Sequence, residues 1–97
     1  MILSFADPAT EDVFNGRSTK PARKLLPAVL HAVARRKLDA LNVAQRITDL
    51  RVPPGNHLEA LKGDRAGQHS IRINDQFRIC FTWTSAGPQH VQVVDYH

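Results

Sequence analysis

The stretch GQHSIRINDQFRICFTWTSAGPQHVQVVDYH, Gly67–His97, decides the fold of this chain. Its apolar and polar residues alternate with the two-residue period of a β-strand, and turn-forming residues separate the alternating runs. The same stretch carries arginines and closes on Asp95-Tyr96-His97. We therefore expect antiparallel strands in the last third of the chain, with reactive side chains at their end.

The register of the first hairpin follows from this alternation. Residues directly opposite one another in an antiparallel pair point to the same face, so the apolar residues of both strands must share a face. Pairing Ile71 with Ile79 satisfies this condition and leaves Asn74-Asp75-Gln76 as the loop. Arg72 then lies opposite Arg78 on the other face, where the two charges repel unless a shared anion offsets the cost.

A second turn, Ser85–Pro88, returns the chain as a last strand whose alternation is less regular. Val91 and Val93 have one parity and Val94 has the other. This change predicts a bulge or a strand end near Val94, and it leaves open which face the final three side chains occupy.

The first half of the chain carries helix signals. Asp7-Pro8 is typical of a capped helix start, and Gly16 of a helix end, which predicts a helix of about two turns. Pro21 opens a second helix that reaches about Leu41, and Pro27 should kink or delay it. Shorter elements are expected as a strand at residues 2–5, a helix at 43–50 capped by Asn42, and a strand at 57–61.

Size and composition predict one globular domain, residues 1–97, of the α+β class: two or three N-terminal helices on a small twisted antiparallel sheet. Apolar residues make up 42% of the chain and charged residues 23%, as in ordinary globular proteins. The longest mostly apolar run, Leu25–Ala34, is too short for a membrane helix, so no membrane partner is expected. The early acids Asp7, Glu11 and Asp12 do not fit a signal peptide, and the single Cys80 fits a reducing compartment, so we expect a cytoplasmic protein.

Positive charge is concentrated in the helical half. The chain has 13 Lys and Arg residues against 9 Asp and Glu residues, a net charge of +4. No acid lies between Val13 and Leu38, a range that holds Arg17, Lys20, Arg23, Lys24, Arg35, Arg36 and Lys37. Such a surface is typical of a protein that meets nucleic acid, and equally of a solvated helix face.

The polar residues of the second half suit RNA cleavage without a metal. That reaction needs a base for the 2′-OH, an acid for the departing 5′-oxygen, and fixed positive charge at the phosphate. Histidine can serve as base or acid, arginine can grip phosphate bidentately, and tyrosine can stack on a base or donate a proton. The candidates are His57, Lys62, Arg65, Arg72, Arg78, Asp95, Tyr96 and His97.

Each candidate also has a purely structural interpretation. Asp95–His97 can be a polar strand end, and the cations can be solvated surface residues. Phe77, Phe81 and Trp83 are expected in the core rather than as a base-stacking platform. Cys80 is expected to be a small filler. The histidines show no metal-ligand spacing, so we expect no metal and no cofactor.

The second half of the chain closely resembles the HigB group of toxins in the RelE superfamily, the killer proteins of bacterial toxin–antitoxin modules. The resemblance covers about Leu50–His97 and rests on order and spacing in PPGN (53–56), LEALKGDR (58–65), GQHSIRINDQ (67–76), Arg78 and VDYH (94–97). The helical half agrees only in layout.

This resemblance implies a ribosome-dependent endoribonuclease that cuts mRNA in the decoding site. It also implies a helix-turn-helix antitoxin as partner, with operator DNA bound only through the toxin–antitoxin complex. Lys62, Asp95, Tyr96 and His97 would form the catalytic cluster, while Arg72 and Arg78 hold phosphate. His57 stands where similar proteins usually have arginine, so phosphate binding and proton transfer both stay open for it.

Two alternatives come from other classes of protein. A non-catalytic RNA or ribosome binder would keep the basic helix and the arginines but would not depend on Asp95–His97. A chain that serves chiefly as the structural partner of an antitoxin within a repressor would cut no RNA. Deleting Asp95–His97 should leave inhibition and binding by such a binder intact, whereas only cleavage separates the structural partner from a toxin enzyme.

Overall fold

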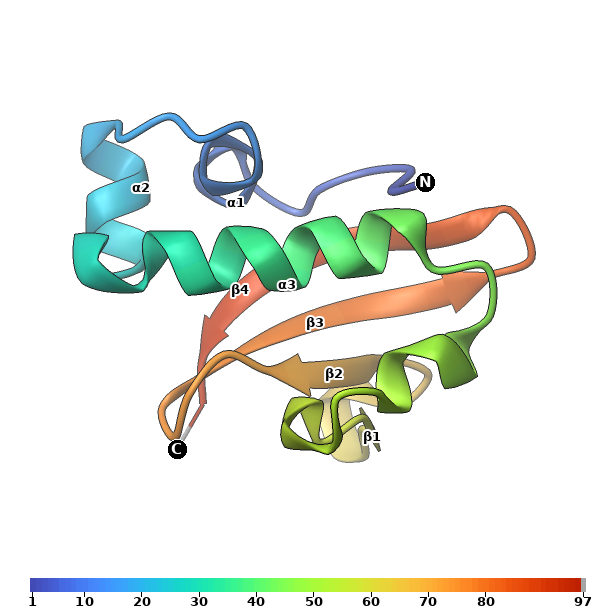
Figure 1. Cartoon of the computed structure of the whole chain (residues 1–97). Helices are drawn as coiled ribbons and strands as arrows, with labels where there is room; N and C mark the ends of the chain where they lie inside the picture. The colour runs from blue at the N-terminus through green and yellow to red at the C-terminus, as the bar shows by residue number, and fades with distance from the viewer. Residues whose placement is uncertain (97) are drawn as a thin grey trace.

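Helices cover one face of a four-stranded antiparallel sheet in the computed structural model, which describes residues 1–96 (Figure 1). The helices are α1 (Pro8–Phe14), α2 (Lys20–Leu25) and α3 (His31–Val43). The strands, in both chain and sheet order, are β1 (Glu59–Ala60), β2 (His69–Arg72), β3 (Phe77–Thr84) and β4 (Gly87–Asp95). Short 3₁₀ turns are η1 (Ala28–Leu30), η2 (Ile47–Arg51), η3 (Pro54–Asn56) and η4 (Gly63–Arg65). The expected α+β class is confirmed.

Helix α1 has the limits that its sequence predicts. Asp7 Oδ1 accepts a hydrogen bond from the backbone N–H of Thr10 at 2.7 Å, which satisfies a donor that the first turn leaves unpaired. Pro8 begins the helix, and Gly16, just beyond its end, has a φ of +74°. A left-handed residue at that position stops a helix, and glycine adopts it without steric cost.

Pro27 divides the helix that was expected from Pro21 to Leu41. The residue before a proline is disfavoured in the helical region, and Leu26 is extended, with φ −149° and ψ 131°. Helix α2 therefore ends at Leu25, and the chain passes through η1 before α3 begins. The effect of Pro27 was predicted as a kink or delay, whereas it separates two helices.

Three shorter elements differ from the expectation. Helix α3 continues through Asn42, whose Oδ1 accepts from the backbone N–H of Ile2 at 2.8 Å instead of capping a new helix. The expected helix at 43–50 is the 3₁₀ turn η2. The expected first strand is a single parallel bridge between Phe5 and Val91, and the strand expected at 57–61 is the two-residue β1.

The register of the β2–β3 hairpin is confirmed. Ile71 pairs with Ile79 and Arg72 with Arg78, as the side-chain alternation requires. Asn74 closes the loop, because its Oδ1 accepts from the backbone N–H of Gln76 at 2.9 Å and of Phe77 at 2.8 Å.

The irregularity in β4 lies earlier than the valine pattern suggested. Cys80 pairs with Gln92 but Thr82 pairs with Gln89, so one extra residue is accommodated in β4 opposite Phe81. His90, at this point, has a φ of +54°. The bulge is therefore at His90 and not near Val94, and the last part of β4 keeps its alternation as far as Asp95.

The core fills the space between the helices and one face of the sheet. Fully buried apolar side chains come from both layers, among them Leu26, Ala34, Leu38, Leu41, Ile71, Ile79, Phe81 and Val91. Each of the larger ones contributes about 1.5–3 kcal/mol relative to an exposed side chain. Phe77 is also buried and Trp83 packs against the core, as expected for these aromatic residues.

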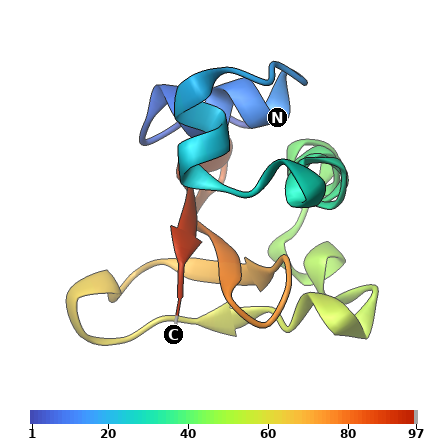
Figure 2. The ribbon, with the colours of Figure 1, turned by 90° about the vertical axis from the view of Figure 1, so that its left-hand side faces the viewer.

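The opposite face of the sheet is the one that positions the candidate site. Figure 2, turned by 90°, shows α3 nearly end-on and β1 at the far end of the molecule from α1 and α2. No helix in residues 1–96 has the length and apolar character needed to cross a lipid bilayer.

Candidate active site on the sheet face opposite the helices

Two rows of paired residues form this face of the sheet. Antiparallel neighbours point to the same side, so each row can be read from the register. The rows are Ser70–Cys80–Gln92 and Arg72–Arg78–Val94, each with one residue from β2, β3 and β4. The first row consists of short or uncharged polar side chains, and the second contains two arginines that pair across β2 and β3.

Arg78 is held by contacts with three different segments. Its Nε donates to Ser70 Oγ at 2.7 Å, and its Nη2 donates to the backbone carbonyl oxygen of His57 at 2.6 Å. Its Cζ lies 5.8 Å from the centroid of the Tyr96 ring, within the range of a cation–π contact. These contacts fix the guanidinium against the strand from which it projects.

Arg72 turns away from Arg78 to different partners. Its Nε donates to the carbonyl oxygen of Asn74 at 3.1 Å, and its Nη2 forms an ion pair with Asp75. The separate partners reduce the repulsion that the register imposes on the two arginines. Because the Asp75 carboxylate is 95% exposed, this ion pair is weak, and Arg72 can exchange it for another anion at little cost.

Arg65 reaches this face from η4. Its Nη1 donates to Gln68 Oε1 at 3.0 Å and lies 3.5 Å from Gln92 Oε1, the β4 member of the polar row. Burial raises the pKa of the Cys80 thiol although Arg65 and Arg78 act in the opposite direction. A buried thiol that stays protonated is a poor nucleophile, which agrees with the expected role of Cys80 as a filler.

Of the two described candidates at the chain end, Tyr96 lies beside Arg78. Tyr96 continues the parity of Gln92 and Val94, and its ring lies beside Arg78. The residue is 40% exposed. Asp95 has the other parity, opposite Phe77, and its Oδ2 accepts from Gln76 Nε2 at 3.2 Å. His97 lies outside the described residues, so its place in the cluster stays a prediction.

Lys62 and His57 are less directly involved than their sequence positions suggested. The Lys62 side chain is exposed and has no hydrogen bond or ion pair within residues 1–96. His57 is left-handed, with φ 46° and ψ 55°, and it meets Arg78 through its backbone carbonyl rather than its imidazole. The structure thus brings Arg78 and Tyr96 into contact. Arg72 pairs with Arg78 across the strands but is bound to the Asn74–Asp75 loop, and Arg65 reaches the same face of the sheet at Gln92.

Ser70 and Gln92 were missed by sequence reasoning. Ser70 shares parity with Arg72 on a short strand, and this parity is the signal that could have placed it on the arginine face. Gln92 had no comparable signal, because the position of the bulge decides which residues of β4 face the arginines.

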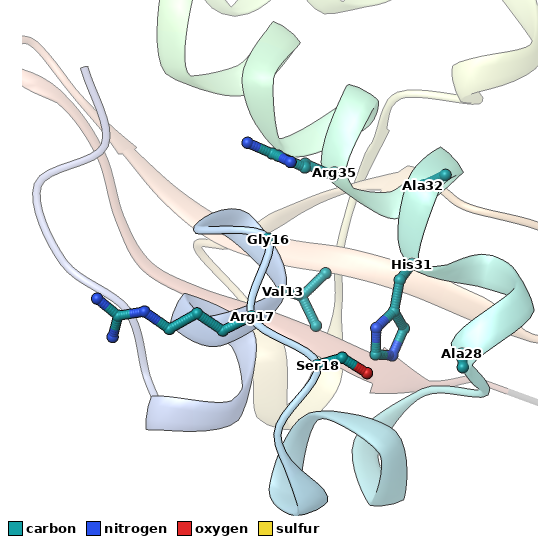
Figure 3. A pocket seen from close by; sticks show the side chains of 8 residues that line it. All are labelled: Val13, Gly16, Arg17, Ser18, Ala28, His31, Ala32 and Arg35. Carbon is teal, nitrogen blue, oxygen red and sulfur yellow. The ribbon is translucent and has the colours of Figure 1, made fainter.

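A separate hollow of about 330 Å³ lies on the helical side, lined by Val13, Gly16, Arg17, Ser18, Ala28, His31, Ala32 and Arg35 (Figure 3). His31 Nε2 lies 2.8 Å from the carbonyl oxygen of Leu26 and 3.2 Å from that of Ala22, so its ring ties α2 to α3. The side chains of Arg17 and Arg35 have no hydrogen bond or ion pair within the described residues. Within residues 1–96, none of the candidate catalytic residues lines this hollow.

Residues 1–96 contain no group of three or more His, Cys, Asp or Glu residues placed to hold a metal ion. The candidate site is instead cationic, so its side chains suit an anionic ligand such as phosphate.

Comparisons with known proteins bear on the family and the fold of the chain. A family profile described as "RelE-like toxin of type II toxin-antitoxin system HigB" matches residues 3–97. The toxin HigB-1 of Vibrio cholerae serotype O1 is 39% identical over 83 residues, 86% of this chain and 84% of that protein. An uncharacterized protein of Haemophilus influenzae is 41% identical over 58 residues, 60% of this chain and 57% of its own. In fold, the chain is similar to one in the YoeB–YefM complex from Staphylococcus aureus, with a TM-score of 0.60, 15% identity, and coverage of 100% of this chain and 95% of that one.

Proposed function

The chain belongs to the HigB family of RelE-like toxins of type II toxin–antitoxin systems, and from this membership we propose that it is a ribosome-dependent endoribonuclease that cuts mRNA. The observation that carries the proposal is the arrangement around Arg78. Its guanidinium is held by two neutral acceptors, Ser70 Oγ and the His57 carbonyl oxygen, and lies beside the ring of the exposed Tyr96. Arg72 pairs with Arg78 on the neighbouring strand. This arrangement can grip a phosphate and support the neighbouring base.

The reaction would use the 2′-OH of the mRNA as nucleophile. Attack on the adjacent phosphate gives a 2′,3′-cyclic phosphate and releases a 5′-OH, with no metal in the mechanism. Arg78 and Arg72 would stabilise the charge that develops on the phosphate oxygens. Tyr96 would orient the nucleotide, and His97 or Asp95 would take the proton of the 2′-OH. The departing 5′-oxygen would take a proton from His57 or from water.

The remaining candidates have supporting roles in this proposal. Arg65 and Lys62 would add positive charge at the edge of the site, where the mRNA backbone passes. Because the carbonyl of His57 already binds Arg78, the exposed imidazole of His57 is the group free to meet phosphate or exchange a proton. On the ribosome the toxin would hold the mRNA in position, which supplies much of the rate.

An antitoxin is the protein partner that the family supports. The structural neighbour is part of a complex whose two components are named YoeB and YefM. We propose that the partner of this chain is a helix-turn-helix antitoxin, and that the chain reaches operator DNA only through that partner.

The proposal is tested by inducing the wild type and an Arg78→Ala, His97→Ala double variant in cells, then mapping RNA 5′ ends in ribosome-bound and free transcripts. We expect growth arrest and new 5′-OH ends in ribosome-bound mRNA for the wild type alone. Equal growth and identical ends in both strains would refute an endoribonuclease.

A non-catalytic RNA or ribosome binder is the second candidate. It is favoured by the unpaired side chains of Arg17 and Arg35 on the helical side, within a range that carries no acid. If that function holds, a chain lacking Asp95–His97 still inhibits translation and still binds ribosomes. If the endoribonuclease function holds, the shortened chain binds but leaves the mRNA intact.

A further inference from the structure

Ser70 has a role that the sequence did not indicate: we propose that it is a positioning residue, acting with the backbone carbonyl of His57 to aim Arg78 at the phosphate of the mRNA. This inference deepens the proposed function and rests on it. It concerns how the site is built, and no part of the proton transfer is assigned to Ser70.

The Ser70 hydroxyl is committed to Arg78. The residue is fully buried in β2, between Glu59 of β1 and Cys80 of β3, so its backbone is fixed on both sides. A buried hydroxyl requires a hydrogen-bond partner, and the partner of Ser70 Oγ within residues 1–96 is Arg78 Nε, at 2.7 Å. Water cannot easily replace this contact because the site of the hydroxyl is closed to solvent.

The second acceptor, the backbone carbonyl of His57, is held in place by a turn that does not involve Ser70. His57 has the left-handed conformation, which is uncommon for a residue with a side chain and persists only where the surroundings enforce it. The preceding residue, Asn56, is fully buried, and its Nδ2 donates to the carbonyl oxygens of Leu50 at 3.1 Å and Val52 at 3.3 Å. This anchored turn presents the His57 carbonyl to Arg78 Nη2.

The two contacts occupy one edge of the guanidinium and leave another free. Arginine has five N–H donors in a planar fork. Nε–H and one N–H of Nη2 are used by Ser70 and His57, so both N–H groups of Nη1 and the second of Nη2 remain. Nη1 and Nη2 together form the end fork that binds phosphate bidentately. The positions of the two acceptors therefore determine where that fork points.

The neutrality of both acceptors argues against a purely structural arginine. A hydroxyl and a backbone carbonyl orient the guanidinium without cancelling its charge. Within the described residues Arg78 forms no salt bridge, whereas its neighbour Arg72 is paired with Asp75. Arg78 thus keeps its full charge for an incoming anion while its orientation is fixed, which is the preorganisation that phosphate stabilisation needs.

The test is a double-mutant cycle of Ser70→Ala and Arg78→Ala, measured in two ways: single-turnover cleavage of ribosome-bound mRNA, and affinity for the same ribosome complex carrying a 2′-deoxy mRNA that cannot be cut. Alone, Ser70→Ala should lower the cleavage rate about tenfold, as expected for loss of a hydrogen bond to a charged group. In the Arg78→Ala background the same change should have no further effect, because its action passes through Arg78.

Two controls separate positioning from general destabilisation. Thr82→Ala removes a hydroxyl from the same face of β3 that has no hydrogen bond within residues 1–96, and it should leave rate and affinity unchanged. If Ser70→Ala does not fold, the matched pair Ser70→Thr and Ser70→Val differs by one hydroxyl, and only the threonine variant should retain activity.

The inference would be overturned if Ser70→Ala lowered the cleavage rate by the same factor in the wild type and in Arg78→Ala. Equal activity of Ser70→Thr and Ser70→Val would also overturn it. If the wild type cuts nothing, the proposed function fails, and the affinity cycle still decides the inference. In that case, adding Ser70→Ala to the wild type must weaken RNA binding, and adding it to Arg78→Ala must not. If Ser70→Ala weakens RNA binding equally in both backgrounds, the inference is refuted.

Discussion

Arg78 and Tyr96 lie against each other at the sheet end, with the guanidinium carbon 5.8 Å from the ring centroid. The register explains the contact: Arg78 pairs with Val94, and Tyr96 follows with the same parity. The bulge at His90 contributes to this arrangement, because a regular ladder of the same residues, continued from the Thr84–Gly87 pair, would place Val93 opposite Arg78 and turn the Tyr96 side chain to the other face.

The Tyr96 ring rather than its hydroxyl should matter. Tyr96→Phe keeps a ring beside Arg78 and should retain most of the cleavage rate, while Tyr96→Ala should lose about 1–3 kcal/mol of binding to the nucleotide that it stacks on. Single-turnover cleavage of ribosome-bound mRNA measures both variants. If phenylalanine is as damaging as alanine, the hydroxyl takes part in the chemistry and the stacking role is wrong.

Asp75 should restrain Arg72. Asp75→Asn breaks an exposed ion pair, so the free energy of unfolding should change by less than about 1 kcal/mol. RNA affinity should rise and depend more steeply on salt, since Arg72 becomes free to bind a phosphate. Asp39→Asn, which removes the same charge from the exposed surface of α3, is the control, and an equal rise in that variant would show that only net charge matters.

Cys80 should be unreactive in the folded protein. Its thiol pKa is raised by burial, so the unfolded chain loses this proton first as the pH rises. The contribution of Cys80 to stability is therefore complete below the ordinary thiol pKa and is lost as the pH rises through the alkaline range. Alkylation by iodoacetamide at pH 8 should be much slower in the native protein than in urea, and equal rates would contradict a buried protonated thiol.

Gly87 should tolerate no side chain. Its φ is +139°, and a Cβ there would clash with the backbone carbonyl oxygen of Met1. Gly87→Ala should lower the free energy of unfolding by about 1–3 kcal/mol, through strain and displacement of the N-terminal segment. Gly55→Ala, at a position with no atom within 4 Å of the added Cβ, should be nearly neutral in the same urea titration. Similar losses at both positions would contradict this account.

The hairpin and the helix starts could be predicted from the sequence because local chemistry determines them. The alternation around Ile71 and Ile79 admits only registers that bury both, and a three-residue loop selects the one in which they pair. This register also fixes the Arg72–Arg78 pair. The Asp7-Pro8 start needs only its own first turn. By contrast, the bulge at His90 depends on how β4 pairs with β3 while also meeting Phe5, contacts that join distant parts of the chain.

The anchoring of Arg78 could not be read from residue types. The contact with His57 uses a backbone carbonyl, which every residue has, and it depends on a left-handed turn that nothing in the local sequence marks. Ser70 has no property that distinguishes it from other strand serines until the sheet places it beside Arg78. A site built from cations is visible in sequence, whereas the neutral groups that aim those cations are visible only in the structure.

Cleavage of ribosome-bound mRNA through Arg78 is tested most directly by mapping the 5′ ends of a defined mRNA on purified ribosomes. The mRNA is incubated with wild type, Arg78→Ala or Arg51→Ala, and Arg51, an exposed residue of η2, serves as the control position. If the chain is an endoribonuclease that acts through Arg78, wild type and Arg51→Ala make one cut with a 5′-OH end. A 2′-deoxy nucleotide at the cut position abolishes this cut, and Arg78→Ala makes almost none of it. A cut that survives the 2′-deoxy substitution, or that Arg78→Ala makes as fast as wild type, would contradict this mechanism.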